Sequence, residues 1–193
     1  MELIGLFLVA SGLLVLAGLA KALRPDDTAR ALLELVPERI GFHISLRSAR
    51  AVVRVGATAE TAIGVWALVL PRPASAALVA SSYALFTVVV FYARLRGGPL
   101  STCGCFGRPD TPATWSHVAV NALLTFAAAT VALRTTNGAT IRTLLLHQPW
   151  AGFPLFFVSG VGLYLTYLAL SPLATLEGAR RLVRSRPAEA TRS

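Results

Sequence analysis

Two cysteines separated by one glycine are the residues of this chain best suited to chemistry. Cys103 and Cys105 are the only cysteines among the 193 residues, and they stand in the segment 101–107, STCGCFG. Gly104 gives the backbone the freedom that a small Cys-x-Cys ring needs, and strained disulfides tend to be oxidising and labile. The spacing therefore predicts a redox pair that alternates between dithiol and disulfide.

Basic residues accompany this pair in the sequence. A cysteine reacts as its thiolate, which nearby positive charge favours, and Arg94, Arg96 and Arg108 flank the two thiols. His117 is a candidate for moving a proton or favouring a thiolate. It shares a helix face with Asn121, four positions on. The competing interpretation of His117 is a histidine whose hydrogen bonds are satisfied at the membrane interface.

Three other interpretations of the cysteines stay open at this point. They are a structural disulfide in an extracellular loop, a metal site completed across a dimer, and two inert loop thiols. Two thiolates with His117 fall short of the four ligands of a tetrahedral site, so we expect no metal.

The elements that position these residues are predicted to be membrane helices. The chain is 55% hydrophobic and only 14% charged, whereas a soluble domain is about a quarter charged. The sequence predicts an all-α integral membrane protein, with a bundle of four core transmembrane helices and a fifth C-terminal span. The predicted spans are about Leu3–Leu23, Val52–Leu70, Ala74–Ala93, Trp115–Leu133 and Ala151–Leu170.

These spans suggest three regions. Residues 1–135 form a membrane domain that contains the Cys-Gly-Cys loop, 136–172 hold the fifth span with its preceding loop, and 173–193 form a basic disordered tail. Between the first two spans, 24–50 mixes charge with regularly spaced apolar residues. We expect an interfacial helix there, with a partner-docking segment as the alternative.

The basic residues predict an orientation. With five spans, 14 of the 18 Lys and Arg residues fall on one side and 3 on the other, and Arg54 lies just inside the second span. We expect the protein to lie in the inner membrane. The positive-inside rule then places the C-terminal tail and the Cys loop on the cytoplasmic side. Disulfides persist outside the cytoplasm. The distribution of basic residues therefore favours the cytoplasmic side of the membrane for the Cys loop, whereas disulfide chemistry favours the opposite side.

Two ionisable residues lie within predicted spans, where charge is costly and marks candidate functional groups. Glu60 is near the middle of the second span and Lys21 is near the end of the first. We expect them to pair between adjacent helices if their depths match. The pair is then either a helix–helix clamp or a proton-handling group.

The chain resembles the methylamine utilisation protein MauE family, within the wider DoxX-like membrane group, over about residues 3–135. The resemblance is carried by STCGCFG at 101–107, by AGLAK at 17–21 and by AETAIG at 59–64. It implies a membrane helical bundle that helps to mature the disulfide-rich small subunit of methylamine dehydrogenase, alongside a thioredoxin-like partner. It also implies that Cys103 and Cys105 are the redox pair, and that Lys21 and Glu60 are structural or proton-linked.

The leading hypothesis is therefore a membrane thiol–disulfide relay, a possible oxidoreductase component, between a thioredoxin-like protein and a disulfide-containing client. The alternatives are a non-catalytic assembly factor and a small-solute transporter that uses Glu60. Membrane lipid is an expected partner, and nucleic acid is not, because no basic face or recognition module stands out. No cofactor is expected: a quinone would serve as electron acceptor, but no motif indicates one.

Overall fold

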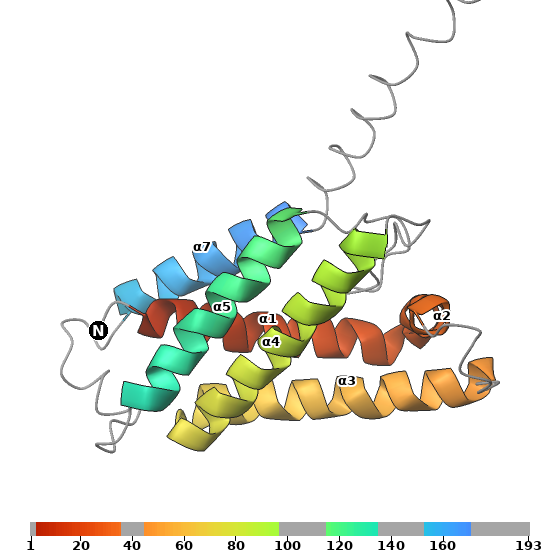
Figure 1. Cartoon of the computed structure of the whole chain (residues 1–193). Coiled ribbons are helices and arrows are strands. Elements are labelled where there is room, and N and C mark those ends of the chain that lie inside the picture. The colour runs from red at the N-terminus through yellow and green to blue at the C-terminus, as the bar shows by residue number, and fades with distance from the viewer. Residues whose placement is uncertain (1–2, 36–44, 97–114, 135–152, 171–193) are drawn as a thin grey trace, which may run out of the picture.

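The computed structural model describes residues 3–35, 45–96, 115–134 and 153–170, and in these ranges the chain is helical without any strand (Figure 1). This confirms the predicted all-α class. The helices are α1 (Ile4–Leu23), α2 (Pro25–Leu35), α3 (Leu46–Val69), α4 (Pro73–Arg96), α5 (Trp115–Arg134) and α7 (Phe153–Leu170).

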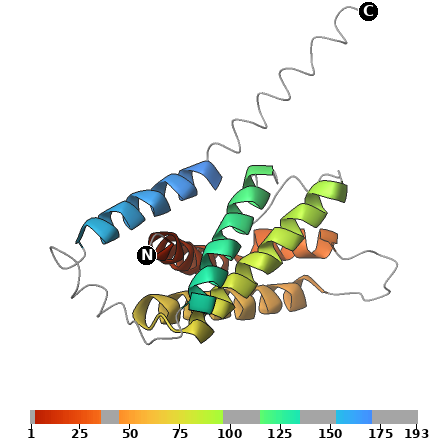
Figure 2. The same ribbon diagram turned by 60° about the vertical axis from the view of Figure 1, so that its left-hand side comes forward.

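Helix α1 is the centre of the bundle. Figure 2 looks partly along α1, which lies between α7 on one side and α3 on the other, with α4 and α5 across it. Its side chains form the largest share of the main core, which also draws on α4 and α5. The core includes Phe7, Leu13, Leu14, Val79, Tyr83 and Leu124.

Four helices are long and apolar enough to cross a membrane: Ile4–Leu23, Leu46–Val69, Pro73–Leu95 and Trp115–Leu133. Each of them overlaps one of the first four predicted spans. Most of the outer surface of α3, α4 and α5 is apolar, with exposed side chains such as Val55, Leu85 and Phe126. In a bilayer such a surface faces lipid tails, so the chain is a membrane protein.

Helix α3 begins at Leu46 rather than at Val52, where the apolar run begins. Ser45 caps it, because its hydroxyl oxygen accepts a hydrogen bond from the backbone N–H of Ser48 at 3.1 Å. Hydropathy locates only the part of a helix that lies in the hydrocarbon core of the membrane. It does not detect helical turns that continue beyond that core. The extra turns carry Arg47 and Arg50.

Helix α2 packs against this extension and confirms a helix between the first two spans. Ala29 of α2 forms a small second core with Ala49 and Val53 of α3. The Asp26 carboxylate holds the Arg50 guanidinium at 2.6 Å. The side chains of α2 divide into an apolar face towards α3 and a polar face away from it, as expected of a helix at the membrane surface.

Helix α7 covers 18 residues, about 27 Å, and packs on α1, where Leu163 lies beside Gly12. Its apolar stretch with described side chains, Phe157–Thr166, is shorter than a span. The fifth transmembrane helix therefore stays a prediction.

Two glycines allow α1 and α3 to make close contact. A Cβ on Gly18 would collide with Thr61 Oγ1 and lie 2.7 Å from the Ala57 carbonyl oxygen, and one on Gly64 would lie 2.8 Å from the Ser11 carbonyl oxygen. Only glycine lets the two backbones approach this closely. Small residues serve the same purpose at helix contacts throughout membrane proteins.

We expect Gly64→Ala to lower the free energy of unfolding by about 1–3 kcal/mol, because the new methyl meets backbone atoms that cannot yield. Gly56→Ala on the same helix is the matched control, since a Cβ there has nothing within 4 Å. It should leave stability unchanged or raise it by about 0.5–1 kcal/mol. Reversible unfolding in mixed detergent measures both, and equal stability of the two variants would contradict the close contact.

Candidate functional site

Cys103 and Cys105 lie outside the described residues, but both helices that flank their segment are described. Helix α4 ends at Arg96, and α5 begins at Trp115. The candidate site is therefore the end of the bundle where α4 finishes and α5 begins.

Aromatic and cationic contacts hold these two helix ends together. The rings of Phe91 and Trp115 meet edge to face with centroids 6.0 Å apart. The Arg94 guanidinium lies over the Trp115 ring, 5.9 Å from its centroid, which is a cation–π contact. The two ends of the Cys segment are thus anchored on each other, and a half-buried positive charge stands beside them.

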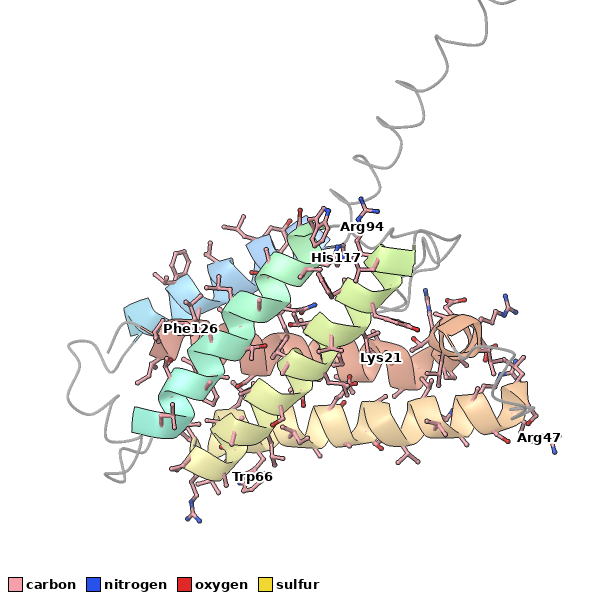
Figure 3. All side chains as sticks on the ribbon, in the orientation of Figure 1. Lys21, Arg47, Trp66, Arg94, His117 and Phe126 are labelled. Carbon is pink, nitrogen blue, oxygen red and sulfur yellow. The ribbon has the colours of Figure 1, made fainter. Side chains whose placement is uncertain are left out.

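Histidine and asparagine line the inner face of α5 at this end. His117 is 3% exposed and Asn121 is 8% exposed, which confirms that they share one face. Figure 3 shows His117 and Arg94 at the same end of the bundle. The role of His117 towards the thiols stays a prediction.

Below this end, Lys21 and Glu60 form the expected ion pair. Lys21 Nζ lies 2.7 Å and 3.0 Å from the two carboxylate oxygens of Glu60, so one ammonium contacts both. The side chains are 8% and 17% exposed. Figure 3 shows Lys21 on α1, between α3 and α4 in the view.

Two aromatic residues of α4 complete this pair and were missed by the sequence analysis. Lys21 Nζ lies over the Phe86 ring, 4.5 Å from its centroid, and Phe86 meets the Tyr83 ring edge to face at 5.8 Å. The Tyr83 hydroxyl donates to the Ala10 carbonyl oxygen at 2.7 Å. The available signal was the spacing of Tyr83 and Phe86, which are one helical turn apart within the third predicted span.

Helix α4 connects the ion pair to the anchored helix ends. Phe86 contacts Lys21 and Phe91 contacts Trp115, and these α4 positions are about 7.5 Å apart along the helix axis. Helix α4 thus places the contact with Lys21 and the contact with Trp115 at neighbouring levels of the bundle.

Positive charge gathers at this end of the molecule. Because the helices alternate in direction, the C-terminal ends of α1 and α4 and the N-terminal ends of α3 and α5 lie together, with α2 beside them (Figure 1). Of the described residues, this end holds Lys21, Arg24, Arg30, Arg47, Arg50, Arg54, Arg94 and Arg96, whereas Arg72, in the α3–α4 turn, and Arg134, the last residue of α5, lie at the opposite end.

An all-helical bundle with four membrane-length helices and an intramembrane ion pair defines an integral membrane protein of the multi-span helical class. The chain belongs to the methylamine utilisation protein MauE family, whose model matches residues 1–134. That range covers α1 to α5 and ends at Arg134, the last residue of α5, so α7 lies beyond it. The family prediction is confirmed, and it links the chain to methylamine utilisation. No curated protein and no solved structure matches the chain.

We expect Lys21→Met to lower the free energy of unfolding by about 3–5 kcal/mol, because Glu60 then keeps a buried carboxylate without its partner. Lys21→Met/Glu60→Met should recover most of the loss, since it removes both charges. Detergent unfolding of the three proteins measures the coupling between the residues.

The matched control is Arg50→Met, which breaks the more exposed pair with Asp26 and should cost no more than about 1 kcal/mol. A double variant as unstable as Lys21→Met alone would mean that the ion pair is not what holds α1 against α3.

Proposed function

We propose that this protein is a membrane thiol–disulfide exchange component, in which Cys103 and Cys105 react with a thioredoxin-like protein to support disulfide maturation of a client. The observation that carries the proposal is the anchored pair of helix ends, Phe91 and Arg94 on Trp115, because the chain between them contains both cysteines. Membership of a methylamine utilisation family suggests a client of the methylamine dehydrogenase small-subunit type.

The exchange conserves electrons between two cysteine pairs. A thiolate of the thioredoxin-like dithiol attacks one sulfur of the Cys103–Cys105 disulfide, which breaks that bond, forms a mixed disulfide and releases the other sulfur as thiolate. The second thiolate of the partner then attacks the mixed disulfide. The partner leaves as a disulfide, and Cys103 and Cys105 become a dithiol that has gained two electrons and two protons.

The same steps run in reverse, so the relative reduction potentials of the two pairs set the direction. Arg94 supports the thiolate form of the cysteines by its positive charge, because it stands within the last turn of the helix that leads to them. His117 is our candidate for accepting the released proton, since it lies in the first turn of the helix that follows them.

We expect Cys105→Ser and Cys103→Ser, tested separately, to differ in the covalent adduct that they form with a thioredoxin-like protein under mild oxidation. The variant that retains the attacking cysteine should accumulate the mixed disulfide, because the residue that resolves it is gone. Non-reducing electrophoresis and mass spectrometry of the adduct identify both cysteines. The control is Cys103→Ser/Cys105→Ser, which should form no adduct. If neither single variant forms an adduct, the proposed exchange function is contradicted.

The same variants separate exchange from an assembly role. If the bundle acts only as a scaffold, Cys103→Ser/Cys105→Ser supports normal growth on methylamine and normal maturation of the client. Exchange predicts that the double variant loses client disulfides while the protein still inserts and folds.

The clustered arginines support a cytoplasmic position for the Cys loop and the C-terminal tail in the inner membrane. We therefore expect Cys103 and Cys105, after reduction, to resist a membrane-impermeant maleimide in intact cells and to react after permeabilisation. Ala74→Cys in a Cys103→Ser/Cys105→Ser background is the matched control. It places an exposed thiol at the opposite end of the bundle and should react in intact cells. The reverse labelling pattern would invert the topology.

A further inference from the structure

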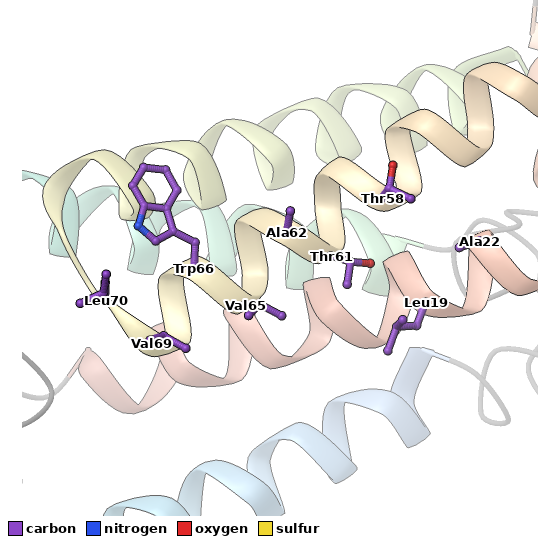
Figure 4. Close-up of a pocket in the computed structure, with 9 residues that line it drawn as sticks. All are labelled: Leu19, Ala22, Thr58, Thr61, Ala62, Val65, Trp66, Val69 and Leu70. Carbon is purple, nitrogen blue, oxygen red and sulfur yellow. The ribbon is translucent and has the colours of Figure 1, made fainter.

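A groove follows the outer side of the contact between α1 and α3. It has a volume of about 600 Å³, and Figure 4 shows its lining. Helix α1 contributes Leu19 and Ala22, and α3 with its C-cap contributes the remaining residues, namely Thr58, Thr61, Ala62, Val65, Trp66, Val69 and the C-cap Leu70. The hydroxyls of Thr58 and Thr61 donate to carbonyl oxygens of their own helix, so the groove surface is almost wholly apolar.

Arginines continue the groove at one end. Along α3, Arg54 stands one turn before Thr58, and Arg47 stands two turns before Arg54, so all three share one face of the helix. At the end of α1, Arg24 is the C-cap residue, two positions after Ala22. All three arginine side chains are exposed. The antiparallel arrangement of α1 and α3 brings Arg24 and Arg54 to the same end of the groove.

These arginines are not neutralised by the described carboxylates. The ion pairs in the described part of the chain are Lys21–Glu60 and Asp26–Arg50. Arg24 and Arg54 take part in neither, although Lys21 and Arg50 are close to them in sequence. An apolar channel with free positive charge at one end matches a molecule with an apolar tail and an anionic head.

We propose that the groove is a binding site for an anionic phospholipid, with an acyl chain along Thr61, Val65 and Trp66 and the phosphate at Arg24 and Arg54. The dimensions agree, because Arg54 and Trp66 are about 18 Å apart along α3, slightly more than half of a hydrocarbon core of about 30 Å. The site uses none of the residues assigned to thiol chemistry, so it stands apart from the proposed exchange function.

Charge also argues against a second copy of the chain as the occupant. A two-fold axis along the membrane normal would bring the same face of each copy together at the same depth. Arg54 would then meet Arg54 of the other copy, and like charges repel. A lipid phosphate supplies the opposite charge and accepts hydrogen bonds from the guanidinium groups.

The test is a lipid titration of the detergent-released full-length protein, read by native mass spectrometry. We expect phosphatidylglycerol to bind about 30-fold more tightly than phosphatidylcholine of the same acyl composition, since each arginine near an anionic headgroup contributes about 1 kcal/mol. Arg24→Gln/Arg54→Gln should abolish this preference. Ala62→Trp, which fills the groove without changing charge, should weaken binding of both lipids.

Two control variants make the same change of charge elsewhere. Arg30→Gln lies on α2 at the same end but off the groove, and Arg72→Gln lies at the opposite end. Both should keep the preference for phosphatidylglycerol. The proposal is overturned by equal binding of the two lipids to the unaltered protein, by loss of the preference in the Arg30 control, or by a lipid-free dimer that Ala62→Trp dissociates.

Discussion

A lysine and a glutamate inside the bilayer must meet, because either charge alone is costly there. In this protein the meeting depends on how closely α1 and α3 approach. Gly18 lies against Ala57 and Thr61, which flank Glu60 on α3, and Lys21 is one turn beyond Gly18 on α1. The glycine contact thus sets the separation at which one ammonium reaches both carboxylate oxygens. Substrate coupling by Glu60, as in a transporter, would require breaking this pair.

The ion pair also fixes the position of α4. The Phe86 ring of α4 lies against the Lys21 ammonium, and the Tyr83 hydroxyl donates a hydrogen bond from the same stretch of α4 to the Ala10 carbonyl oxygen of α1. Since α4 is a single helix, the contacts of Tyr83 and Phe86 in its middle also fix the direction of its C-terminal turns. In those turns, Phe91 and Arg94 contact Trp115 of α5. The chain of contacts runs from a helix–helix clamp to the ends that carry the cysteines.

Sequence patterns predicted those features that depend only on neighbouring residues or on the order of residues along the chain. Apolar length located four membrane helices, and the scarcity of intramembrane charge singled out Lys21 and Glu60 as a pair, which the structure confirms. The start of α3 was placed too late, because the Ser45 cap acts outside the apolar run. The contacts of Tyr83 and Phe86 and the groove beside Trp66 were not predicted, because they depend on which helix faces meet. Periodicity cannot settle that in helices that are apolar all round.

The distribution of burial among the cations decides which of them can influence the thiols in a cell. Lys21 is compensated by Glu60 and adds little net field. Arg24, Arg47 and Arg54 are exposed, so salt screens them beyond about 8 Å at physiological ionic strength, and their natural partners are lipid phosphates within direct contact. Arg94 is partly buried against Trp115 and is, among the arginines with described side chains, the nearest in sequence to Cys103. Because buried charges are screened less than exposed ones, Arg94 is the arginine to which we assign the proposed effect on the thiols. The two proposals, lipid binding and thiol activation at one positive end of the bundle, therefore draw on different arginines.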